Sequence, residues 1–555
     1  MAGNSTEKAY EKAATPLPAL SLPGNENSTL NMAVAAAEGN GDPSNDQMPP
    51  FSVFNRAQKR IITWQTSLSA VFSGLSSFIY YPTITALSES LHVSVAAINL
   101  TVAAYLIVAG IAPSVFGDIS DQTGRRPVSL LTITLYFAAN IGLAIQNSYT
   151  ALVALRCLQS AGSAATIAIA HGVISDITTP AERGYYVGIL FGFTNAAPSL
   201  GPVIGGAITK YLSWRWVFWL LSILSGCQLG NLLIFFPETL RKLVGNGITP
   251  PSYWPNKSIF SIYKARKNHH QRQDMRSSPA ANSNRTRGFL NAVPNPLSCL
   301  RTMFQKGNSI LISVGAIHYA IYSVLGTSIS TEMAELYGLN PLLSGLLYLP
   351  SGIGGLIASL QTGRLLDYQY KVVARSLEAS TPPSISSNHS PTTLPTSTPP
   401  VSASPSQPND LYAFLIERAR LRAMAPFLLI SSFSTLGYGW SLHYKAHIAV
   451  PLLMQLLSGS TQVAIFVIIG TLLTDFNPGR SSTAQAAYSM VRCDLAAGGV
   501  AALRPLVESV GVGWCFTIAT GASVLCAPLL VGLWLWGWGW RRERQERDEE
   551  RVVGR

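Results

Sequence analysis

Long apolar segments recur along the whole chain, and each is bounded by glycine, proline or clustered charge. A helix needs about 20 mostly apolar residues to cross the hydrocarbon core of a bilayer. The pattern therefore predicts an all-α membrane protein with twelve transmembrane helices in two groups of six. We place the spans near 61–83, 95–116, 128–146, 150–172, 185–209, 216–236, 308–330, 341–361, 427–444, 447–474, 484–506 and 511–538.

Polar segments divide the chain around these two groups. Stretches poor in bulky apolar residues cannot offset the entropy of ordering, so we expect three segments to be disordered: the N-terminal tail, the middle of the central loop around 272–287, and the stretch 376–408. The expected parts are a disordered tail at 1–60, a six-helix half at 61–236, a central loop at 237–307, a second six-helix half at 308–540 with a disordered Ser/Thr/Pro-rich insertion at 376–408, and a charged tail at 541–555.

Composition agrees with the span pattern, and charge orients it. Hydrophobic residues make up 48% of the chain and charged residues only 12%, as in a membrane protein. The net charge of +12 could suggest a nucleic-acid partner, but 33 of the 39 Lys and Arg residues fall in alternate segments, on one side of the predicted membrane. Such a bias marks the cytoplasmic side. We therefore expect both termini in the cytoplasm and no nucleic-acid partner.

The segment between the second and third spans reads GDISDQTGRRP, with a partial copy, GRLLD, after the eighth span. The pattern GxxxDxxGRR resembles the signature loop of the major facilitator superfamily, and a second copy fits a duplicated six-helix unit. The resemblance implies the major facilitator fold with two pseudo-symmetric halves, and a gate at this loop. We expect the paired arginines to anchor at lipid headgroups and to pair with acids on neighbouring helices; a merely topogenic basic loop is the alternative. The gate residues are Gly117, Asp121, Gly124, Arg125, Arg126, Gly363 and Asp367.

The fourth span contains Arg156 and Gln159 in an RxxQxxG pattern that resembles the superfamily's motif on that helix. A guanidinium at membrane depth is costly unless it faces a polar interior, so we expect Arg156 to face the cavity together with Gln159. The resemblance implies a part for Arg156 in proton coupling. The alternative is an arginine that extends its side chain toward the outer membrane surface.

The fifth span contains the sequence GPVIGG, which resembles the GPxxGG element associated with antiporters of the superfamily. Its residues are Gly201, Pro202, Gly205 and Gly206. Regularly spaced glycines allow close helix packing, and prolines soften a helix, so such a helix suits two alternative packings. The sequence PETLR, followed by VGNG, after the sixth span is similar to fungal drug:proton antiporters of the twelve-spanner group.

Polar residues within predicted spans form the candidate substrate and proton pathway, because such residues are functional by default at membrane depth. Asp494 is the single acid that we place well inside a span; burial there would make it a proton carrier. The pathway residues are Asn99, Tyr105, Arg156, Gln159, Asn195, His318, Tyr322, Gln455, Tyr488, Arg492 and Asp494.

These patterns predict a proton-coupled antiporter that exports small organic molecules, such as drugs, toxins or secondary metabolites, across the plasma membrane. Its expected partners are an organic substrate, the proton and the lipid bilayer, and we expect a monomer. The sequence holds no enzyme motif and no metal-ligand spacing, so we expect neither catalysis nor a cofactor. Two alternatives stay open. One is a dedicated citrate-like organic-acid exporter with Arg156 and Arg492 as carboxylate ligands, and the other is a non-transporting membrane sensor.

Overall fold

The computed structural model describes residues 51–247, 256–257, 296–338, 341–380 and 416–553, and this part of the chain is helical with no strand. It contains twelve helices of 20 residues or more. The first six are α2 (Arg56–Phe78), α4 (Val95–Thr123), α5 (Arg125–Ile145), α6 (Tyr149–Ile177), α7 (Pro180–Tyr211) and α8 (Trp214–Phe235). The second six are α12 (Lys306–Ser328), α15 (Leu349–Ser380), α17 (Met424–His443), α18 (Ala449–Phe476), α19 (Ser481–Val510) and α20 (Val512–Val553).

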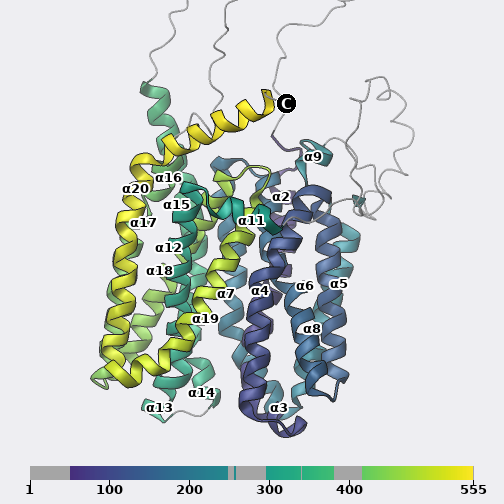
Figure 1. Ribbon diagram of the computed structural model, residues 1–555, viewed down its shortest axis with the longest axis vertical. Helices are drawn as coiled ribbons and strands as arrows, with labels where there is room; N and C mark the ends of the chain where they lie inside the picture. The colour runs from purple at the N-terminus through teal and green to yellow at the C-terminus, as the bar shows by residue number, and fades with distance from the viewer. Residues whose placement is uncertain (1–50, 248–255, 258–295, 339–340, 381–415, 554–555) are drawn as a thin grey trace, which may run out of the picture. The chain divides into compact units, whose positions relative to one another are not determined.

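Short helices connect the long ones. They are η1 (Tyr81–Thr83), α3 (Ile84–Leu91), α9 (Arg241–Val244), α11 (Pro296–Met303), η5 (Ile329–Met333), α13 (Ala334–Tyr337), α14 (Pro341–Leu346) and α16 (Ile416–Leu421). In Figure 1, α9, α11 and α16 lie at one end of the bundle, and α3, α13 and α14 lie at the other. We call these the α9 end and the α3 end.

Within the described residues, eight of the long helices are apolar enough over 18 residues to cross a membrane by length and composition. The other four, α2, α15, α17 and α19, are as long but less apolar. Large apolar side chains stand exposed on the outer helices, among them Ile107, Phe433 and Leu525. Outward-facing apolar side chains over long helices are what a lipid environment requires.

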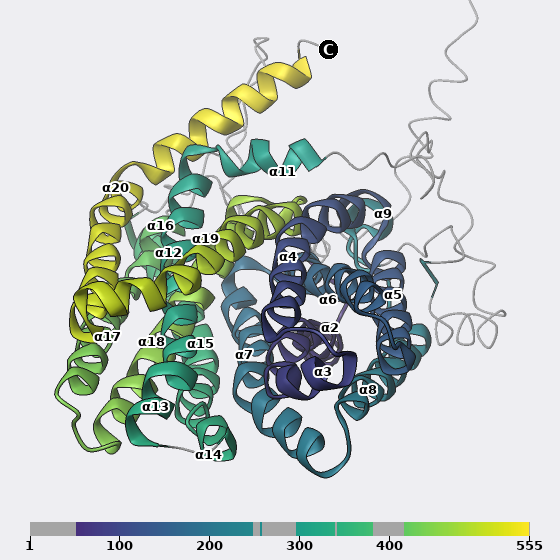
Figure 2. The ribbon, with the colours of Figure 1, turned by 60° about the horizontal axis from the view of Figure 1, so that its bottom comes forward.

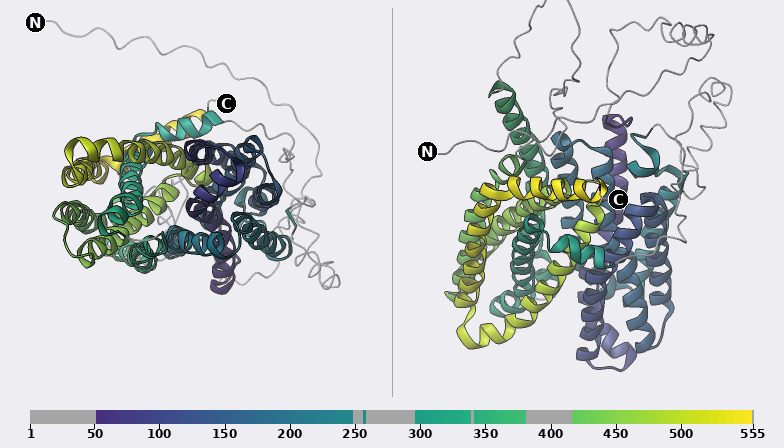
Figure 3. Two further views of the ribbon diagram at one scale, coloured as in Figure 1. Left: turned by 90° about the horizontal axis from the view of Figure 1, so that it is seen from below. Right: turned by 45° about the horizontal axis from the view of Figure 1, so that its top comes forward.

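The second set of six helices repeats the contacts of the first. In the first set, α2 packs on α7, α4 on α6, and α5 on α6 and α8; in the second, α12 packs on α19, α15 on α18, and α17 on α18 and α20. The two sets meet through α4 against α19 and through α7 against α15, and these two contacts are equivalent under the same repeat. Figures 2 and 3 show the two sets side by side. We call them the first and second halves.

Several predicted boundaries are wrong. The first span begins at Arg56, so residues 56–60 are helical and do not belong to a disordered tail. An N-cap at Asn55, whose side chain accepts from the Gln58 amide at 2.9 Å, starts the helix there. The predicted eighth span at 341–361 is instead the short α14 followed by α15. That helix continues to Ser380, so residues 376–380 of the expected insertion are helical as well.

The other expected disordered segments, 1–50, most of the central loop and 381–408, lie outside the described residues.

The expected gate loop is shorter than its motif. Gly117 and Asp121 lie inside α4, which runs on to Thr123, and Gly124 alone separates α4 from α5. Gly124 has a φ of 129°, a region that residues with a Cβ avoid. Gly117 serves close packing instead, since a Cβ there would lie 3.1 Å from the carbonyl oxygen of Ser482 on α19.

Candidate functional site

A buried arginine at the α9 end joins three helices of the first half. Arg125, the first residue of α5, is fully buried and forms ion pairs with Asp121 on α4 and with Asp176 on α6, the latter at 2.8 Å. The arginine is placed there because the single residue Gly124 turns the chain from α4 directly into α5. The prediction that Arg125 pairs with acids is confirmed, and the prediction that it anchors at headgroups is wrong because its side chain is buried.

The same cluster reaches the second half at the start of α19. The Asp121 carboxylate accepts hydrogen bonds from the Thr483 amide at 3.0 Å and from the Thr483 hydroxyl at 2.7 Å. Arg125 donates to the hydroxyl of Ser482 at 2.8 Å. A carboxylate at a helix N-terminus satisfies free amides and complements the helix dipole. The gate residues Asp121 and Arg125 therefore bind the two halves together at this end.

Arg126 has a different role from its neighbour. It is also buried, and its guanidinium donates to the carbonyl oxygens of Phe236 and Leu233, at 2.8 Å and 2.7 Å. Glu238, just after α8, accepts from the backbone amides of Arg125 and Arg126 at 2.9 Å and 3.2 Å. Burial raises the pKa of the Glu238 carboxyl, and these amide hydrogen bonds oppose the rise. Arg126 and Glu238 thus connect α5 to the end of α8 within the first half.

The second half contains an equivalent cluster. Asp367, in the middle of α15, accepts from the amides of Gly184 and Tyr185 at the start of α7, both at 2.9 Å. Arg420 on α16 lies 3.6 Å from Asp367 and 3.3 Å from Asp475 on α18. Under the repeat, Arg420 and its two acids correspond to Arg125 and its two acids. Gly363 packs on the same segment, where a Cβ would lie 2.5 Å from the Gly184 carbonyl oxygen.

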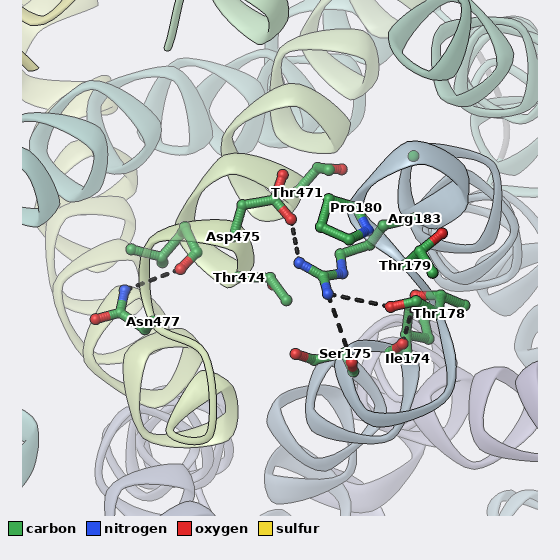
Figure 4. A network of polar contacts seen from close by, with 12 residues as sticks. Ile174, Ser175, Thr178, Thr179, Pro180, Arg183, Thr471, Thr474, Asp475 and Asn477 are labelled. Atoms are coloured by element: carbon green, nitrogen blue, oxygen red, sulfur yellow. Dashed lines mark hydrogen bonds and ion pairs between the residues drawn. The ribbon is translucent and has the colours of Figure 1, made fainter. Parts of the chain in front are cut away.

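Asp475 also connects the two halves directly. Arg183 of α7 forms an ion pair with Asp475 and donates to the carbonyl oxygens of Thr178 and Ser175 at 3.2 Å and 3.5 Å. Figure 4 shows this arginine between the end of α6 and the end of α18. Arg420 adds a hydrogen bond to the carbonyl oxygen of Pro180.

Our sequence interpretation missed the second arginine of this system. It identified only a partial motif copy, GRLLD, in the second half, whereas Arg420 takes the place of Arg125 after a long insertion. The sequence contained a signal for this role. Arg420 precedes the ninth span just as Arg125 precedes the third, and Asp475 and Asp176 lie at the ends of the tenth and fourth long helices. We call the two clusters, Asp121–Arg125–Asp176 and Asp367–Arg420–Asp475 with Arg183, the double latch.

The GPxxGG helix packs against both halves. A Cβ on Gly205 would lie 2.3 Å from the carbonyl oxygen of Ile79, and Gly201 is similarly close to the end of α2. Nearer its start, α7 meets α15, where a Cβ on Gly188 would lie 2.5 Å from the Ser359 carbonyl oxygen. Gly206 has more space, since a Cβ there would be 3.9 Å from its nearest neighbour. Pro202 lies within the continuous helix.

Two of the predicted first-half residues, Tyr105 and Gln159, lie against Arg156. Its guanidinium lies between the rings of Tyr80 and Tyr105, at 4.0 Å and 4.4 Å from their centroids. It donates to the Gln159 side-chain oxygen at 2.7 Å and to the Ser76 carbonyl at 3.3 Å. Arg156 is only 1% exposed, so it does not extend to the membrane surface.

In the second half, Arg492 on α19 also lies among tyrosines, although it is not the repeat counterpart of Arg156. It lies over the rings of Tyr319 and Tyr488, at 4.5 Å and 5.3 Å. Tyr322 is one turn beyond Tyr319 and donates to the Asn195 side chain across the interface at 3.5 Å. This contact joins α12 to α7.

The remaining predicted pathway residues do not join one cluster. His318 is buried within the second half and contacts Gln462 at 3.0 Å, and Gln455 is buried on the same helix as Gln462, α18. Asp494 is exposed and turned toward Gly110 of α4, so the expectation of a buried acid is wrong. Asn99 lies near the start of α4, and its side chain is not among those that the structure describes.

Comparisons with known proteins agree with this architecture. The family model described as Major Facilitator Superfamily matches residues 66–377. The MFS-type transporter phiD of a fungal species (strain ATCC 74256) is 37% identical over 507 residues, which cover 91% of this chain and 72% of phiD. Citrate exporter 1 of Aspergillus niger is 34% identical over 490 residues, covering 87% of each chain. The crystal structure of the human organic anion transporter MFSD10 has a TM-score of 0.57 at 16% identity, covering 87% of this chain and all of MFSD10.

Proposed function

Since this chain belongs to the major facilitator superfamily and is thus a multi-pass membrane transporter, we propose that it is a proton-coupled antiporter that exports small organic molecules across the plasma membrane. The proposed cargo is a drug, toxin, secreted metabolite or organic acid, and the citrate exporter among its relatives supports including organic acids. In this proposal the α9 end is cytoplasmic and carries both termini, in line with the Lys and Arg bias of the sequence.

The observation that carries the proposal is the position of α7 between the halves. Its glycines place it against α2 at Gly205 and against α15 at Gly188. Rocking of one half on the other must therefore change the packing of this helix. Alternating access by such rocking is the usual mechanism of transporters built from repeats. The GPxxGG element on the same helix favours antiport over symport or facilitation.

The double latch supports the same mechanism. Its inter-half contacts, from Asp121 to Thr483, from Arg183 to Asp475 and from Asp367 to the start of α7, all lie at the α9 end. A transporter held closed at its cytoplasmic end presents its interior to the outside, and opening this end requires breaking these bonds.

Flux measurements in proteoliposomes test the proposal. Purified full-length protein is reconstituted, a pH gradient is imposed, and uptake of a broad panel of organic acids, cations and neutral drugs is followed. We expect at least one compound to move against its gradient, and an uncoupler that collapses the pH gradient should abolish that accumulation. Binding without any proton-linked flux across the panel would favour the sensor, and flux that ignores the pH gradient would contradict antiport.

A further inference from the structure

Arg156 has one edge of its guanidinium without a partner. Its Nη1 atom donates to Gln159 and to the Ser76 carbonyl, whereas its Nε and Nη2 atoms are buried without a hydrogen bond. In an arginine, Nε–H and Nη2–H point the same way and form the side-on fork that a carboxylate binds through two parallel hydrogen bonds. The unsatisfied donors of Arg156 are therefore the matched pair that an oxyanion would occupy.

Three other deeply buried arginines pair with acids, and a fourth, Arg126, donates to backbone carbonyl oxygens. Arg125, Arg183 and Arg420 each have an Asp partner in the double latch. In the ranges that the structure covers, neither Arg156 nor Arg492 forms an ion pair with an acid. An uncompensated cation is costly at membrane depth, so these two arginines are the exception that needs a counter-charge.

The two unpaired arginines face a common region between the halves. Arg156 of α6 stacks on Tyr105 of α4, and Arg492 of α19 stacks on Tyr319 of α12; both α4 and α6 pack against α19. The two arginines and their tyrosines therefore belong to helices that meet at the contact between the halves.

We propose that this protein transports organic anions, with a substrate carboxylate bound to the Nε–Nη2 fork of Arg156 and with Arg492 as the second cationic anchor. The assignment rests on the proposed function, since it names the charge class of the exported molecule. Arg156 is buried in the conformation described, so the carboxylate reaches the fork in another conformation of the transport cycle.

Proteoliposomes with the full-length protein provide the test. The probes are citrate, carboxyfluorescein, inorganic phosphate and the organic cation ethidium, each followed with and without a pH gradient. The variants are Arg156→Lys and Arg492→Lys, which keep the charge and remove the planar fork, and Arg504→Lys, an exposed arginine near the α3 end, is the matched control. Melting temperatures of the purified variants report whether they fold.

We expect uptake of citrate or carboxyfluorescein, and a drop of at least about ten-fold in that uptake at subsaturating concentration for Arg156→Lys, because a single ammonium cannot replace a bidentate contact. Arg492→Lys should lower the same flux, and Arg504→Lys should not. Carboxylate flux that is unchanged in a folded Arg156→Lys protein would overturn the inference, as would transport of ethidium or phosphate alone.

The inference and the proposed function fail in different ways. Proton-driven ethidium transport without carboxylate transport would support the proposed antiporter and contradict the proposed anion site. Carboxylate transport that depends on Arg156 but is independent of the pH gradient would support the anion site and contradict proton coupling. Should none of the four probes move, the anion inference falls, and the broad panel then decides the proposed function.

Discussion

The ion pair between Arg183 and Asp475 allows a quantitative test of the double latch. On opening of the α9 end, Arg183 keeps its hydrogen bonds to Thr178 and Ser175, which belong to its own half, and loses only Asp475. Asp475 keeps Arg420, which also belongs to its own half. A hydrogen bond to a charged group contributes about 1.5–3 kcal/mol net. Arg183→Gln should therefore favour the open state by about 2 kcal/mol, or about 30-fold in the conformational equilibrium.

Asp475→Asn should have a second effect beyond this shift. It removes the same inter-half contact, and it also leaves the fully buried Arg420 and Arg183 without the carboxylate that they share. Removing one partner of a buried ion pair destabilises a protein by about 3–5 kcal/mol. We therefore expect similar opening in the two variants but a lower melting temperature for Asp475→Asn than for Arg183→Gln.

A buried reporter cysteine measures the opening. Ala486 on α19 is fully buried and packs near Gly117 of the opposite half, so Ala486→Cys in a background without native cysteines should react slowly with N-ethylmaleimide. Adding Arg183→Gln should speed labelling by about 30-fold, because N-ethylmaleimide reaches the cysteine only when the α9 end is open. Arg504→Gln serves as the exposed-arginine control and should leave the rate unchanged. Equal labelling with and without Arg183→Gln, in protein of unchanged melting temperature, would refute the reasoning.

Two further predictions concern positions outside the latch. Gly205→Ala should lower both transport and melting temperature, because its Cβ would lie 2.3 Å from the Ile79 carbonyl oxygen. Overpacking of this kind costs about 1–3 kcal/mol. In the control variant Gly206→Ala, the Cβ would be 3.9 Å from its nearest neighbour, so flux and stability should stay near those of the native protein. Burial raises the pKa of Glu238, so the folded protein holds its proton at pH values where the unfolded chain has lost it. The contribution of Glu238 to stability should then fall as pH rises above its ordinary pKa, and Glu238→Gln should flatten the melting temperature measured over that window. A wild-type profile as flat as that of the variant would contradict this assignment.

Much of the helical architecture could be predicted because its signals are local. Apolar length and periodicity are carried by consecutive residues, so all twelve long helices could be placed, and the fold class and family followed from short motifs. The predicted helix boundaries were wrong where interactions at a helix end determine its length. Capping by Asn55 starts α2 early, and α4 continues to Thr123 through a motif that we interpreted as a loop.

The environment of the interior residues could not be predicted in this way. Arg156 and Asp494 both look like costly charges in the sequence, yet the structure buries the first between two tyrosines and leaves the second exposed. Helical periodicity gives the face on which a residue lies but not the helix that covers this face. The orientation in the membrane and the proton carrier therefore stay predictions.

By itself, the sequence determined the all-helical membrane class, the number of long helices, the repeat of two halves and the superfamily, since each of these depends on neighbouring residues. Only the tertiary structure decided which helix ends meet. Arg420, Asp475 and Arg183 are far apart in the chain and form one cluster because α16, α18 and α7 converge at the α9 end. Ion pairs depend on distance in space, which local sequence does not encode, so both the double latch and the two unpaired interior arginines became visible only in the folded chain.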